Sequence, residues 1–124
     1  MFVRHYTEVQ ALPVAMEGAE SVLIRNLITA HEGAPNFSMR VFDVAPGGHT
    51  PLHQHNYEHE IFILEGEGEV TEGRRILALS PGSVVFIPPN LPHQFRNPGE
   101  GVLRFICLIP NQPGAVGAAP PAKA

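Results

Sequence analysis

Three histidines lie close together near the middle of the chain, in the segment His53-Gln54-His55-Asn56-Tyr57-Glu58-His59-Glu60. Residues separated by an even number of positions project from the same face of an extended strand. Neutral imidazole is the commonest protein ligand of divalent metal ions. The spacing of His53, His55 and His59 therefore predicts a metal site on one face of a strand.

His93 is the fourth candidate ligand. It follows His59 after several short apolar runs and turns, so the chain has room to run out and return. This would place His93 opposite the first three histidines across the interior of a small β-barrel, where interior and exterior residues alternate. Glu60 is an alternative to His59. A regular strand would point Glu60 away from the histidine face, and only a bulge would turn it inward.

The segments that must position these residues are short apolar runs separated by turn-forming residues. The chain has 13 prolines and 12 glycines, several of them in Pro-Gly pairs, a pattern typical of an all-β sandwich or barrel. A turn is expected at Pro46-Gly47-Gly48. Strands are expected over residues 21–28, 37–44, 60–64, 75–79, 83–87, 93–97 and 102–109. The first of these also permits one or two helical turns. A further short strand is expected to end at residue 70.

Composition bounds the class of protein. A chain of 124 residues with 44% hydrophobic and 16% charged residues fits one globular domain. We divide it into an N-terminal arm (1–20), a barrel (21–110) and a Pro/Gly/Ala-rich tail (111–124) that we expect to be flexible. The net charge of −4 argues against a nucleic-acid partner. No apolar run approaches membrane-spanning length and no signal-peptide pattern is present. The single cysteine fits a reducing cytoplasm.

Two stretches resemble the two motifs of the cupin superfamily. The first consists of Gly47, His53 and His55, and the second of Pro81-Gly82, Pro88, His93 and Asn97. Two positions depart from the usual pattern: His59 stands where cupins usually have a glutamate ligand, and Asn90 stands where the second motif usually has glycine. With histidine at position 59, the motif resembles that of a subgroup of small microbial manganese cupins, which have four histidine ligands.

This resemblance implies a single-domain, dimeric jelly-roll β-barrel with the metal ligands His53, His55, His59 and His93. It also implies the oxidative chemistry seen in some members. The resemblance favours manganese as the metal, with iron second. Imidazole also suits copper, nickel and zinc. Four neutral ligands leave the charge of a divalent ion uncompensated, which should strengthen it as a Lewis acid.

Further residues are candidates for the pocket wall. Phe105 and Cys107 share parity on the last expected strand, and Ile61 and Phe95 follow the parity of the ligands, although interior residues are more often ordinary core. Cys107 is either a small apolar filler or a thiol near the metal. Arg40 points inward to bind an anionic substrate or lies on the solvent face. We favour the solvent face because arginine is rarely buried unpaired.

Both faces of the expected strands 60–64 and 83–87 are apolar, which a lone barrel in water does not need. We therefore predict a homodimer in which a partner covers the outer face, with exchange of an N-terminal strand such as 22–28.

Three functions are compatible with this pattern. The leading hypothesis is a metal-dependent oxidoreductase, dioxygenase-like or peroxide-using, that acts on a small organic substrate. The alternatives are a non-redox lyase or isomerase and a binding protein without turnover. The sequence assigns no catalytic residue beyond the metal ligands.

Overall fold

A computed structural model describes residues 1–112. In this part of the chain the only helical segments are two 3-10 turns, η1 (Tyr6–Glu8) and η2 (Ala30–Glu32), so the all-β prediction is confirmed. The segment predicted as strand or helix at 21–28 is a strand. The strands are β1 (Leu12–Pro13), β2 (Glu20–Ile28), β3 (Phe37–His49), β4 (His59–Glu65), β5 (Gly68–Glu72), β6 (Arg75–Leu79), β7 (Val84–Ile87), β8 (Gln94–Arg96) and β9 (Leu103–Pro110).

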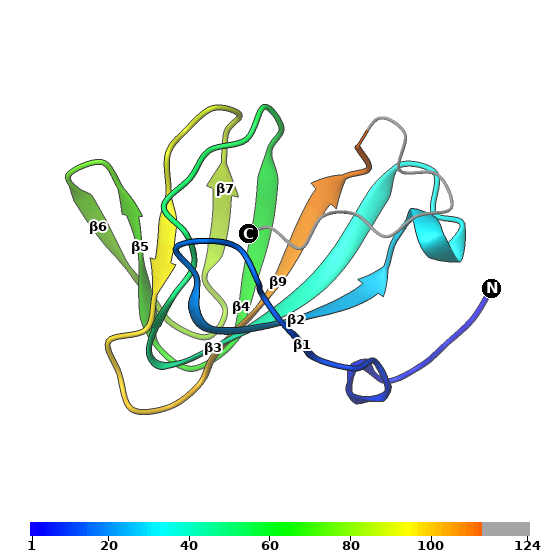
Figure 1. The fold of residues 1–124 in the computed structure, drawn as a ribbon, viewed down its shortest axis with the longest axis horizontal. Helices are drawn as coiled ribbons and strands as arrows, with labels where there is room; N and C mark the ends of the chain where they lie inside the picture. The colour runs from blue at the N-terminus through cyan, green and yellow to red at the C-terminus, as the bar shows by residue number, and fades with distance from the viewer. Residues whose placement is uncertain (113–124) are drawn as a thin grey trace.

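The strands form one antiparallel sheet in the order β6-β5-β8-β3-β9-β4-β7, with β2 added to β3 and β1 added to β2. The sheet curls strongly, so that β5 and β8 face β4 and β9 across the interior (Figure 1). This is the predicted jelly-roll architecture. Strand β2 pairs with β3 of the same chain.

Strand β3 is longer than expected. The predicted stop at Pro46-Gly47-Gly48 is wrong, because β3 continues to His49, which pairs with Glu20 of β2 and Arg96 of β8. The register between the two strands shifts between the pairs Glu20–His49 and Val22–Val44, so the extra residues lie in β3. Glycine at position 48 permits the close approach, since a Cβ there would lie 2.6 Å from the Glu20 carbonyl oxygen.

The segment from residue 53 to residue 58 is not the regular strand that the histidine parity assumed. His53 forms an isolated bridge with His93, the chain bends at Asn56 and Tyr57, and β4 begins only at His59. The histidines are therefore brought together by a loop tied to the sheet rather than by strand alternation alone.

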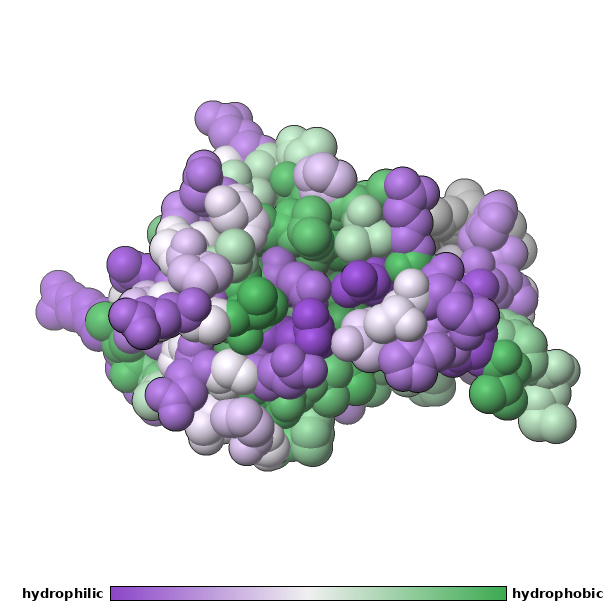
Figure 2. Space-filling view, turned by 90° about the horizontal axis from the view of Figure 1, so that it is seen from below, coloured by the Kyte–Doolittle hydropathy of each residue, from purple (hydrophilic) through white to green (hydrophobic). Residues whose placement is uncertain are grey.

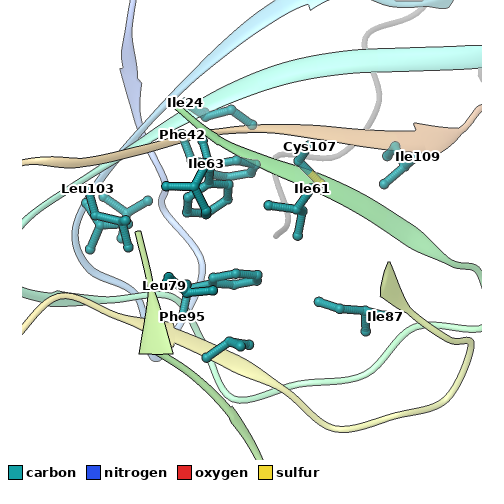
Figure 3. Packing of buried hydrophobic residues seen from close by; sticks show 14 residues of the cluster. Ile24, Phe42, Ile61, Ile63, Leu79, Ile87, Phe95, Leu103, Cys107 and Ile109 are labelled. Atoms are coloured by element: carbon teal, nitrogen blue, oxygen red, sulfur yellow. The ribbon is translucent and has the colours of Figure 1, made fainter. Parts of the chain in front are cut away.

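The core lies between the two sides of the curled sheet. Phe105 stacks on Phe42 and Phe95, with ring centroids 5.4 and 4.6 Å away. Figure 3 shows Phe95 and Leu79 on one side and Phe42 and Ile63 on the other. Ile61 and Cys107 are register partners on β4 and β9. Aromatic packing of this kind contributes beyond simple burial of apolar area. On the outside, hydrophilic side chains separate smaller hydrophobic groups on the face seen in Figure 2.

The N-terminal arm packs against the sheet through Tyr6, whose ring lies under the guanidinium groups of Arg25 and Arg104 at 5.4 and 5.6 Å. At the other end, Asn111 hydrogen-bonds to Ser38 and to the Ala34 carbonyl. The remainder of the predicted tail, from residue 113, lies outside the described residues. Within residues 1–112, no helix has the length and apolar character needed to cross a bilayer.

Candidate metal centre

Four histidine rings converge inside the curled sheet. The ring centroid of His53 lies 4.3 Å from that of His55 and 5.1 Å from that of His93. The ring of His59 is 4.8 Å from His55 and 5.3 Å from His93. Ligand nitrogens of His53, His55 and His93 all lie within 4.8 Å of one another. His59 is outside this closest group, although its ring adjoins two members.

Backbone hydrogen bonds hold the four histidines in place. His53 and His93 exchange two of them, with N···O distances of 3.2 and 3.0 Å. The Asn90 N–H donates to the His55 carbonyl, which ties the loop after His53 to the turn before His93. His59 pairs with Ile87 of β7 at the start of β4. Backbone pairing therefore fixes the segments that carry the four histidine rings.

The outer ring nitrogens of His53 and His93 contact backbone carbonyls. His53 Nδ1 lies 2.7 Å from the Pro51 oxygen, and His93 Nδ1 lies 2.9 Å from the Leu91 oxygen. A carbonyl oxygen can only accept, so Nδ1 carries the proton in both rings. In a neutral ring with this tautomer the lone pair is on Nε2, the atom that a metal ligand would use, and such a contact is the usual way in which proteins orient ligating histidines.

His59 is buried and has a sulfur partner. Its Nδ1 lies 3.2 Å from Cys107 Sγ, and its Nε2 is buried with no hydrogen-bond partner among the described residues. Burial, followed by the charge of Arg40 and the three neighbouring histidines, lowers the pKa of His59 to about 2. The ring is therefore neutral and presents an unused lone-pair or N–H position inside the protein, which fits a metal ligand.

Arg40 contradicts the expectation of a solvent-facing side chain. It is fully buried on β3, its Nη2 donates to Cys107 Sγ at 3.1 Å, and its guanidinium lies over the Phe42 ring at 5.1 Å. Arg40 shares the inward parity of Ser38, Phe42 and Val44. A general preference of arginine for the surface misled the prediction at a position where strand alternation pointed inward.

The other pocket candidates are interior residues. Ile61, Phe95, Phe105 and Cys107 all belong to the buried cluster, and the Phe95 ring packs edge-on against His93 with centroids 6.3 Å apart. Burial raises the pKa of the Cys107 thiol, while the charge of Arg40 acts in the opposite direction. Cys107 is thus a neutral thiol that contacts both Arg40 and His59.

Glu60 lies on the opposite face of β4. It is exposed and lines a hollow on the outside of the sheet together with Phe62 and Phe86. The side chain points away from the histidine cluster, as its odd parity relative to His59 indicates.

Tyr57 is a member of the site that the sequence analysis did not single out. Its half-buried ring stacks on His55 with centroids 4.8 Å apart and an interplanar angle of 1°, and it lies 5.6 Å from His59. Desolvation raises the pKa of its hydroxyl. Its position two residues from both His55 and His59 was the available signal.

The residues present fit a divalent metal ion. Imidazole nitrogens converge, two of the rings have Nδ1 fixed by carbonyls, and a third buries an Nε2 without a described hydrogen-bond partner. Imidazole donors suit manganese, iron, nickel, copper and zinc.

Fold and site together define a cupin. The sequence profile of the family described as "Cupin domain" matches residues 40–109, and the chain belongs to this family.

Similar proteins of known structure include the polyketide cyclase RemF from Streptomyces resistomycificus. It is 36% identical, with a TM-score of 0.86, and the match covers 90% of this chain and 80% of that one. A cupin-2 domain protein from Rhodospirillum rubrum is 32% identical, with a TM-score of 0.77 and coverage of 90% and 75%.

A curated relative is the 1-methylthio-D-xylulose 5-phosphate methylsulfurylase of Rhodospirillum rubrum, which is 41% identical over 57% of this chain and 46% of its own length. The oxalate-binding protein of Thermotoga maritima is 34% identical over 52% of this chain and 54% of its own length. The chain spans about half the length of these curated relatives.

Proposed function

We propose that the protein is a metal-dependent enzyme that holds a divalent transition metal ion through His53, His55, His59 and His93 and acts on a small organic molecule. The convergence of the four imidazole rings carries this proposal. Glu60, the alternative ligand, faces outward. Manganese is the first candidate metal and iron the second, following the resemblance of the motif to four-histidine manganese cupins.

A metal ion bound by neutral imidazoles supplies Lewis-acid chemistry at a substrate oxygen. The protein's own residues prepare the site for it. Carbonyl contacts orient His53 and His93, and the side chains of Ile61, Phe95 and Phe105 give the interior an apolar wall that excludes water. An apolar wall strengthens electrostatic interactions with a bound substrate.

The first candidate reaction is non-redox, such as an isomerisation or cyclisation that begins with a polarised carbonyl group. The 36% identity to a polyketide cyclase over most of both chains supports it. The second candidate is an oxidoreductase that uses dioxygen or peroxide. Four neutral ligands favour it because they stabilise the divalent over the trivalent ion and so make the trivalent state more oxidising.

Elemental analysis of the purified protein tests the metal site. Wild type should bind one divalent ion per chain, and His53→Ala and His59→Ala should lose most of it. Glu60→Ala is the matched control on the outer face and should retain it. A wild type that binds no ion after incubation with manganese, iron or zinc would contradict the proposal, and so would metal loss in the Glu60 variant alone.

Metal exchange separates the candidate reactions. A Lewis-acid enzyme keeps turnover when zinc replaces manganese or iron, whereas an oxidoreductase loses it and consumes dioxygen or peroxide only with a redox-active ion. A binding protein without turnover would show ligand-induced thermal stabilisation with every metal and form no product.

We also propose that two copies associate through the outer face of β4, β7 and β9, where apolar side chains are exposed. The lone cysteine, buried as a free thiol, supports a location in a reducing compartment, the cytoplasm. Cell fractionation checks the location.

A further inference from the structure

Tyr57 lies in the loop between two proposed metal ligands, and the proposed function gives it no role. Its ring is parallel to that of His55, with an interplanar angle of 1° and centroids 4.8 Å apart. Parallel rings at this distance form the offset stack that aromatic side chains prefer. The Tyr57 ring also stacks on His59, with centroids 5.6 Å apart and an angle of 24°. Because His55 and His59 stack on each other at 4.8 Å and 25°, three nearly parallel rings contact one another.

The Tyr57 ring is itself held in place. The chain bends at Asn56 and Tyr57, and the half-buried Tyr57 ring packs against the buried hydrophobic core. On the other side of the stack His55 is buried, and its carbonyl accepts a hydrogen bond from the Asn90 N–H. That hydrogen bond fixes the backbone of His55 but does not set the rotation of its ring.

The rotation of the His55 ring matters because a metal ligand must aim one nitrogen lone pair at the ion. The last torsion of a histidine side chain has a broad distribution, so the ring needs a contact that holds it at one angle. Each of the other three proposed ligands has a carbonyl oxygen or a sulfur atom near its Nδ1. For His55, the parallel stack on Tyr57 restrains the ring plane.

The stack also favours the metal-bound form of the imidazole. A bound divalent ion withdraws electron density from its ligands, which makes the His55 ring more positive. The face of a tyrosine ring carries negative partial charge and attracts positive groups. The contact between Tyr57 and His55 should therefore be stronger with the metal bound than without it, and a difference of this kind raises the affinity for the ion.

We infer that Tyr57 is a positioning residue of the metal centre, whose ring face orients His55 and thereby strengthens metal binding. The inference rests on the proposed function, because it requires His55 to be a ligand. The effect belongs to the aromatic ring of Tyr57 and not to its hydroxyl group.

Two pairs of substitutions test this role. Tyr57→Phe keeps the stacking ring, whereas Tyr57→Leu removes it and keeps an apolar side chain. Tyr6→Phe and Tyr6→Leu are the controls, because the Tyr6 ring is also half-buried but packs on Arg25 and Arg104. Competition with a chromophoric chelator gives the Kd for zinc, and the visible absorption spectrum of the cobalt-loaded protein reports the coordination geometry. Thermal unfolding is recorded for each variant.

Tyr57→Leu should raise the Kd for zinc about 3- to 10-fold, as expected for loss of one aromatic pair, and should change the cobalt spectrum. Tyr57→Phe and both Tyr6 variants should match the wild type. Tyr57→Val carries the test, with the same expected loss, if the leucine variant does not fold. An unchanged Kd without the ring would overturn the inference. Losses in Tyr57→Phe or in Tyr6→Leu equal to that in Tyr57→Leu would also overturn it.

The two proposals fail separately. A wild type that binds neither zinc nor cobalt removes the metal centre. A wild type that binds both, with an affinity that does not depend on the ring at position 57, removes the role of Tyr57 alone.

Discussion

The two ring nitrogens of His59 have different surroundings, and this difference makes Cys107 a positioning residue. Cys107 Sγ contacts Nδ1 of His59, while Nε2 is buried without a described hydrogen-bond partner. The same sulfur accepts a hydrogen bond from Arg40. Cys107 thereby links one proposed ligand to the buried guanidinium of Arg40 and limits the orientation of both side chains.

Replacing Cys107 should therefore weaken metal binding without removing a ligand. Partners of ligating histidines typically contribute about 10- to 100-fold to metal affinity. We expect Cys107→Ala to raise the Kd for zinc about 10-fold and Cys107→Ser, which keeps a polar contact, to raise it less. Competition with a chromophoric chelator measures these values.

Ile109→Val is the control for this change, since Ile109 is buried on the same face of β9 without a polar contact to a histidine. Its Kd should equal that of wild type. Equal losses in the Cys107 and Ile109 variants would mean that general loosening of the core, and not the sulfur contact, weakens the site.

At the level of single residues, the four histidines that the sequence singled out lie together in the structure, but a loop tied to the sheet, and not even spacing along one strand, brings His53, His55 and His59 together. The expected direction of the Arg40 side chain, toward solvent, was wrong. The preference of arginine for solvent is an average over many proteins, whereas the alternation of Ser38, Arg40, Phe42 and Val44 in β3 decides the direction of this side chain. Tyr57 was overlooked because its contact depends on a bend in the loop, which has no period in the sequence.

At the level of elements, the long strand β3 connects the N-terminal part of the chain to the barrel. It pairs with β2, β8 and β9, and its Asp43 accepts hydrogen bonds from Arg25 of β2 and Arg104 of β9. The Asp43 carboxylate raises the pKa of Arg104 above its ordinary value. The guanidinium groups of both arginines also contact the Tyr6 ring. The Asp43 carboxylate therefore positions the two side chains on which the N-terminal arm packs.

We expect Asp43→Asn to lower the free energy of unfolding by about 2 kcal/mol, because it weakens charge-assisted hydrogen bonds to two partly buried arginines. Glu72→Gln is the matched control. Its partner Arg75 is exposed and 3.7 Å away, so the change should stay within about 0.5 kcal/mol. Urea denaturation of both variants makes the comparison, and similar losses would contradict the role assigned to Asp43.

The strands themselves were largely predictable, because proline and glycine mark the turns between short apolar runs. The connections between the strands were less predictable from the sequence. β3 runs through Pro46-Gly47-Gly48 because its register with β2 shifts there, with the extra residues in β3, and because Gly48 has no side chain. The loop after His53 is held by hydrogen bonds to residues near His93, a long-range pairing that local sequence does not encode.

At the level of the whole molecule, the outer face of β4 and β7 remains apolar. Phe62, Val84 and Phe86 are 46%, 75% and 61% exposed, and the first two are register partners. With Ile106 and Leu108 of β9 they line a hollow of about 440 Å³. Contiguous apolar surface of this kind marks an interaction site more often than a surface left in water. A second copy of the chain, related by a two-fold axis, would present the same surface to it.

Light scattering coupled to size exclusion should therefore give twice the 13.5 kDa mass of the chain for the wild type. Phe86→Glu should shift the protein toward the chain mass, because it would bury a charge in the shared surface at a cost of several kcal/mol. Ile76→Glu is the control, since Ile76 is comparably exposed, at 59%, but lies on β6 at the other edge of the sheet. A wild type at the chain mass at high concentration would remove the dimer. Dissociation by both variants alike would place the interface elsewhere.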